Sequence, residues 1–178
     1  GFTSWTRRHT FSEPEDYKKL IFLAGNMRYE PCYDHWLRVQ NRVGDDIILR
    51  GTIGLEPMQQ VIMDMGTERW CLEWMDRRDE VVRLYEAYRD ARRRLYPLLA
   101  DSPAWHFNYG GNVVVDVIGP EVVEDFYVPN YNEAADVLHA KGKLIGSHLD
   151  ANCRGMAAQI AACDLDYIEA FTPAPDTE

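Results

Sequence analysis

The second half of the chain alternates short apolar runs with helical segments, and this alternation constrains the fold more than any other feature. Three such runs, 105–108, 144–148 and 166–171, have the length and composition of buried strands. The segments between them are long enough for right-handed crossovers between parallel strands. The pattern predicts an α/β chain with a parallel sheet, which is either doubly wound or part of a (β/α)-barrel.

The first half adds one strand and several helices to this prediction. An apolar run at 47–49 predicts a further buried strand that ends at Arg50 and Gly51. Ser12 and Glu15 have the spacing of a capping box, which predicts a helix as far as Gly25. Helices are also expected at 31–43 and 56–65, and an apolar stripe between 81 and 98 predicts the clearest helix of all. The segment 70–75 is compatible with either a strand or irregular structure.

Composition limits both the number of domains and the kinds of partner. The chain has 178 residues, of which 46% are hydrophobic, enough for one core and one domain over residues 1–178. A net charge of −10 argues against binding to nucleic acid or to anionic membranes, because both need clustered cations. No apolar run is long enough to span a membrane. Four cysteines without a C-x-x-C pair, and the absence of a signal-type segment in residues 1–10, predict reduced thiols and a cytoplasmic location.

Polar residues follow several of the expected strands, at the sheet edge where parallel α/β folds place their sites. His148 and Asp150 are two positions apart at the end of one strand, and Glu169 lies near the end of the next. This set predicts three catalytic residues that could also hold a divalent metal such as zinc, or a histidine oriented by a carboxylate. The alternative is a hydrogen-bonded group with no chemical role.

Residues at the other strand ends are candidates for contacting a small-molecule substrate. Arg50 could pair with a substrate carboxylate. Asn108 ends the strand at 105–108, Tyr109 and Asn112 come after it, and all three could contact and orient the substrate. The pair Gly110-Gly111 allows either close approach of the backbone to a substrate or a plain turn. No glycine-rich phosphate motif follows a strand, which argues against dinucleotide and P-loop sites.

Several of these segments together resemble the uroporphyrinogen decarboxylase superfamily, which includes corrinoid-linked methyltransferases. The resemblance is strongest between Val117 and Pro175, and weaker similarity extends upstream to Leu55. The stretches that carry it are Ile118-Gly119-Pro120-Glu121, Phe126-Tyr127-Val128-Pro129, Ser147-His148-Leu149-Asp150 and Asp166-Tyr167-Ile168-Glu169-Ala170-Phe171-Thr172-Pro173.

The resemblance implies a TIM-type (β/α)-barrel with a polar site at its mouth. Members of the superfamily are about twice as long as this chain, and a full barrel needs roughly 250 residues. The chain therefore corresponds to the middle βα units of a longer barrel, that is, to a partial barrel. Partial barrels expose sheet edges, so self-association is expected.

The resemblance also implies a choice of reactions. The zinc-dependent methyltransferases have His-x-Cys where this chain has His148-Leu149-Asp150, so a hard carboxylate replaces a soft thiolate. Methyl transfer from a small donor to a corrinoid on a partner protein, aided by a Lewis acid or a general acid, is the favoured activity. Decarboxylation of a porphyrinogen is the first alternative, and an inactive domain with a role in assembly is the second.

Overall fold

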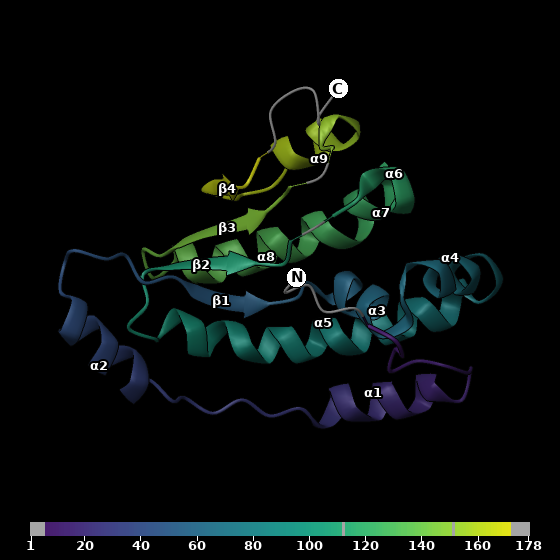
Figure 1. Ribbon diagram of the computed structural model, residues 1–178, viewed down its shortest axis with the longest axis horizontal. Coiled ribbons are helices and arrows are strands. Elements are labelled where there is room, and N and C mark those ends of the chain that lie inside the picture. Colours follow the sequence, from purple (N-terminus) through teal and green to yellow (C-terminus); the bar gives the residue numbers. More distant parts are fainter. Residues whose placement is uncertain (1–5, 112, 151, 172–178) are drawn as a thin grey trace.

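Four parallel strands form one sheet whose spatial order follows their order in the sequence (Figure 1). The computed structural model describes residues 6–111, 113–150 and 152–171. The strands are β1 (Gly51–Gly54), β2 (His106–Tyr109), β3 (Leu144–His148) and β4 (Tyr167–Glu169). Sequential order with parallel pairing requires a crossover between each pair of strands, as in the α/β classes predicted from the sequence.

Helices provide these crossovers and the outer layer. Two long helices, α5 (Arg78–Ala100) and α8 (Val128–His139), pack against each other, with α8 also against β3. Figure 1 shows α1 (Asp16–Asn26) on the side of α5 that faces away from the sheet. The remaining elements are α2 (Asp34–Val43), α3 (Pro57–Met65), α4 (Thr67–Asp76), α6 (Val115–Ile118), α7 (Pro120–Val122), a π-helix η1 (Val123–Tyr127), a 3-10 turn η2 (Arg154–Met156) and α9 (Ala157–Ala161).

Side chains alternate between the two faces of the sheet. One face is covered by helices and holds Ile53, Phe107 and Ile145, all of which are buried. The opposite face, which we call the open face, holds half-buried and exposed residues such as Thr52 and Asn108, which are register partners. Burial of the apolar set on the helix side fixes the register, because a slip of one residue would reverse both faces.

Three local expectations are wrong. The strand predicted at 47–49 begins instead at Gly51, since Ile47 and Ile48 are exposed. The expected capping box does not form: the Asp16 carboxylate, not Glu15, accepts the hydroxyl and N–H of Ser12. The ambiguous segment 70–75 lies within α4.

The described residues contain no helix with the length and apolarity needed to cross a membrane. Their strand order is that of successive βα units, which agrees with the predicted α/β class.

We expect Gly146→Ala to destabilise the protein. Gly146 lies in the interior of β3, and a Cβ atom there would overlap the ring of Tyr167, whose hydroxyl donates to the Phe107 carbonyl at 2.8 Å. Overpacking of this kind costs about 1–3 kcal/mol in the free energy of unfolding. Urea denaturation of the wild type and the variant measures the difference.

Gly25→Ala is the matched control. Gly25 is exposed in α1 with nothing within 4 Å of the new Cβ, so the change should raise stability by about 1 kcal/mol. Equal stability of the Gly146→Ala variant and the wild type would contradict the proposed packing of Tyr167.

Candidate functional site

Four charged or ionisable side chains meet on the open face, and we call them the charged cluster: Arg50, His148, Asp150 and Glu169. His148 is the last residue of β3, and Glu169, the last residue of β4, is its register partner. Parallel pairing puts both at the carboxyl end of the sheet, where the sequence predicted a site. The structure therefore brings the three predicted catalytic residues together.

His148 is flanked by a carboxylate at each ring nitrogen. Its Nε2 lies 3.3 Å from Asp150 Oδ2, and its Nδ1 lies 3.7 Å from Glu169 Oε2. The Glu169 carboxylate also accepts a hydrogen bond from the Arg50 guanidinium. All four side chains are between 33% and 45% exposed, so a ligand in solution can reach them.

This geometry does not fit a metal held by all three predicted ligands. The two nitrogens of an imidazole point in divergent directions, so the carboxylates lie on different sides of the ring rather than around one point. Among the residues that the structure describes, no group of three or more His, Cys, Asp or Glu has the arrangement of a metal site. The arrangement suits a histidine held between two acids better than it suits a zinc centre.

Arg50 was expected at the carboxyl end of a strand, but it lies just before the amino end of β1. Its side chain therefore reaches the site from the amino end of that strand. Its ion pair with Glu169 connects the residue before one edge strand to the other edge strand across the open face.

The predicted substrate contacts divide into three outcomes. Asn108 is on the open face, and its Oδ1 is buried with no hydrogen-bond partner among the described residues. Tyr109 is a correction: its side chain is buried in the core, where its hydroxyl lies 2.8 Å from that of Tyr96, so it cannot contact a substrate on the open face. Asn112 lies outside the described residues.

A buried polar network that the sequence analysis missed lies directly behind the site. Glu56 is fully buried and caps α3: its carboxylate accepts the backbone N–H groups of Met58 at 2.9 Å and Gln59 at 3.1 Å. Its other oxygen accepts from Asn130 Nδ2 at 3.2 Å, and Asn130 also donates to Tyr85 at 2.7 Å. Burial raises the pKa of Glu56 well above its ordinary value, against the two backbone hydrogen bonds, which lower it.

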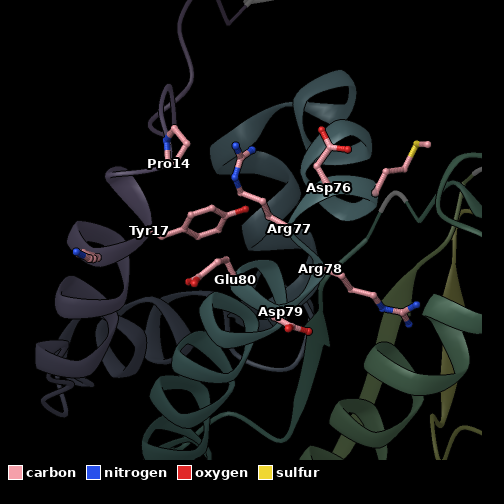
Figure 2. Close-up of a pocket in the computed structure, with 9 residues that line it drawn as sticks. Pro14, Tyr17, Asp76, Arg77, Arg78, Asp79 and Glu80 are labelled. Carbon is pink, nitrogen blue, oxygen red and sulfur yellow. The ribbon is translucent and has the colours of Figure 1, made fainter.

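A large pocket of about 660 Å³ lies away from the charged cluster (Figure 2). It is bordered by the start of α1 and the α4–α5 junction and lined by Pro14, Tyr17, Lys18, Met75, Asp76, Arg77, Arg78, Asp79 and Glu80. Figure 2 shows the Tyr17 hydroxyl directed toward Arg77, whereas Arg78 extends away from both.

The polar groups beneath this pocket neutralise one another. Buried Glu73 accepts the Tyr17 hydroxyl at 3.0 Å and forms ion pairs with Arg69 at 2.6 Å and Arg77 at 3.2 Å. Burial and the Glu73 carboxylate raise the pKa of Tyr17, which therefore stays protonated. These contacts join α1 to α4, so we assign them a structural role.

A smaller and more apolar pocket lies across the Gly110-Gly111 turn from the charged cluster. It has a volume of about 250 Å³ and includes Gln59 and Val113 in its lining. Gln59 donates to the carbonyl of Gly111, and Gly111 in turn packs against His148. The pocket and the charged cluster therefore lie on either side of one turn.

No family model, curated protein or solved structure matches the chain. The resemblance to the uroporphyrinogen decarboxylase superfamily therefore remains an expectation from the sequence.

The raised pKa of Glu56 predicts a specific pH dependence. Its stabilising contribution is fully present below the ordinary value of 4.5 and is lost as the pH rises through the folded-state pKa. Glu56→Gln removes this titration. We therefore expect the free energy of unfolding of the wild type, relative to that of the variant, to fall from pH 4.5 to neutral pH.

Chemical denaturation across this pH range provides the measurement, and Glu121→Gln on the exposed surface is the control. The fall with pH should be larger in the comparison with Glu56→Gln than in the comparison with this control. If the free energies of unfolding of the wild type and Glu56→Gln differ by the same amount at every pH, burial does not raise the pKa of Glu56.

Proposed function

We propose that this protein is an enzyme of the (β/α)-barrel type in which His148 exchanges a proton with a small-molecule substrate. The observation that carries the proposal is the placement of His148 between Asp150 and Glu169 at the carboxyl ends of two parallel strands. A histidine beside carboxylates is a common arrangement in general acid–base catalysis, because the imidazole can both accept and donate a proton.

Each member of the charged cluster then has a role. Glu169, itself paired with Arg50, lies on the Nδ1 side of the ring. Asp150 lies at Nε2 and is 45% exposed, and in this proposal the substrate displaces its carboxylate in order to exchange a proton with Nε2. Arg50 could also bind an anionic group of the substrate through its guanidinium. That group would compete with Glu169 for Arg50.

Methyl transfer is the reaction that we propose for this site, following the family resemblance. A corrinoid on a partner protein would supply the acceptor for the methyl group. As the methyl–oxygen or methyl–nitrogen bond breaks, His148 would donate its proton to the leaving group, which needs this help because it would otherwise depart as an alkoxide, a phenolate or an amide anion. No zinc takes part in this scheme, because the three candidate ligands do not surround a common point.

The apolar pocket beside the turn supports a small donor. Its volume of about 250 Å³ is below the range of roughly 300–1,000 Å³ that accommodates drug-sized ligands. A pocket of this size matches a small methylated compound better than a tetrapyrrole.

Decarboxylation of a porphyrinogen is less compatible with the cluster. Such a substrate carries several carboxylates and needs several cations around it. The cluster offers one guanidinium, and Glu169 already neutralises it.

We also propose that the protein self-associates through its sheet. Within the described residues, β1 and β4 each pair on one side only. Exposed apolar residues lie beside both edges: Ile48 is 68% exposed before β1, and Phe171 is 55% exposed after β4. Sedimentation velocity over a range of concentrations should show a species larger than 20.6 kDa; a monomer throughout would exclude this proposal.

We expect His148→Gln to lower methyl transfer by about 10²–10⁴-fold, the usual contribution of a general acid. The assay follows methylation of reduced cobalamin by methylated alcohols, phenols and amines. His139→Gln is the matched control, because His139 also pairs with a carboxylate, Asp166 at 2.9 Å, but lies at the end of α8.

Equal activity in the wild type and His148→Gln would contradict the role of His148. Decarboxylation of a porphyrinogen, without transfer from any of the donors, would favour the alternative reaction.

A further inference from the structure

The backbone of Gly111 packs against the base of the His148 side chain. A Cβ atom at position 111 would lie 3.1 Å from His148 Cβ and 3.2 Å from the His148 carbonyl oxygen. Gly111 also has φ +148°, a conformation that residues with a Cβ rarely adopt. The sequence left open whether Gly110-Gly111 allows close approach to a substrate or forms a plain turn. In the structure, the approach is to His148.

The turn is held in place from the side opposite His148. Gln59 Nε2 donates to the carbonyl of Gly111, and the N–H of Gly110 donates to Gly54 at 2.9 Å. Gln59 is itself fixed, because its backbone N–H is capped by the buried Glu56. A continuous set of contacts therefore leads from the α3 N-terminus through the turn to His148.

These contacts matter because the carboxylates alone cannot fix the imidazole. Ion pairs between exposed groups are worth only about 0–1 kcal/mol, and each flanking carboxylate is more than one-third exposed. Such weak pairs follow the ring rather than hold it. The turn instead limits the space available to the ring, because a Cβ atom at position 111 would also lie 3.6 Å from the ring atom Cδ2 of His148.

We propose that Gln59 and Gly111 are positioning residues, which set the orientation of the His148 imidazole toward its two carboxylates. The importance of this orientation for catalysis rests on the proposed function. The orientation itself can be measured without any assay of activity, so the two proposals can fail separately.

The first test is Gly111→Ala, observed through the imidazole resonances in two-dimensional ¹H–¹⁵N and ¹H–¹³C NMR spectra. The chain has five histidines, and the His148 resonance is the one absent from His148→Gln. We expect the Gly111→Ala substitution to shift or split this resonance, because the new Cβ displaces the His148 side chain. His35 and His139 should keep their wild-type resonances.

Gly142→Ala separates this effect from backbone strain. Gly142 also has a positive φ, +67°, but nothing lies within 4 Å of its potential Cβ. The control should lose stability without moving the His148 resonance. A shift of the same size in both variants would mean that general strain, not contact with His148, is responsible.

Gln59→Leu provides a second test that adds no Cβ to the turn. It keeps an extended side chain on α3 and removes the hydrogen bond to the Gly111 carbonyl, so the His148 resonance should shift or broaden here too. Folded Gly111→Ala and Gln59→Leu proteins that both keep the wild-type His148 resonance would overturn the proposal. If Gly111→Ala does not fold, Gln59→Leu decides it alone.

Discussion

The fully buried carboxylate of Glu56 is the interaction on which the arrangement of the site depends. Burial of this carboxyl group is costly, and two backbone N–H groups of α3 and the Asn130 amide offset part of that cost. These hydrogen bonds join the segment after β1 to α8. The Gly110-Gly111 turn, which follows β2, packs against this segment. Gly110 must lack a side chain because its Cβ would lie 3.1 Å from the Glu56 Cβ. The turn that contacts His148 therefore takes its position from this buried group.

The charged cluster follows a different physical rule, because it is accessible to solvent. Its charges alternate in sign along the series Arg50, Glu169, His148 and Asp150 when the imidazole is protonated. Neutral His148 leaves one guanidinium against two carboxylates, so the cluster gains a net negative charge when the proton leaves. The buried Glu56 network thus fixes the backbone beneath the site, whereas the charge of the exposed charged cluster can change.

The sequence predicted the strands from their apolar residues, and this worked where those residues are buried. It failed at β1, where Ile47 and Ile48 are exposed and only Ile53 within the strand is buried. Tyr109 failed for a reason that alternation could have shown, since neighbouring residues of a strand face opposite sides and Asn108 is on the open face. The cap formed by Glu56 could also have been predicted from the sequence, because an acidic residue before a proline can begin a helix. The contact between Gly111 and His148 could not have been predicted from the sequence, because it depends on how two separate segments meet in space.

Asp150 explains how one position could serve either of two chemistries. Strand alternation puts the side chains of residues two apart on the same side, so a thiolate at 150 could join His148 at a metal. In this chain a carboxylate lies there instead, 3.3 Å from Nε2, with Glu169 on the side of the other nitrogen. A soft metal activates a thiol, whereas a protonated imidazole helps a more basic group to leave. Under the proposed function, the carboxylate at this position is the reason to expect ethers and amines, rather than thiols, as substrates.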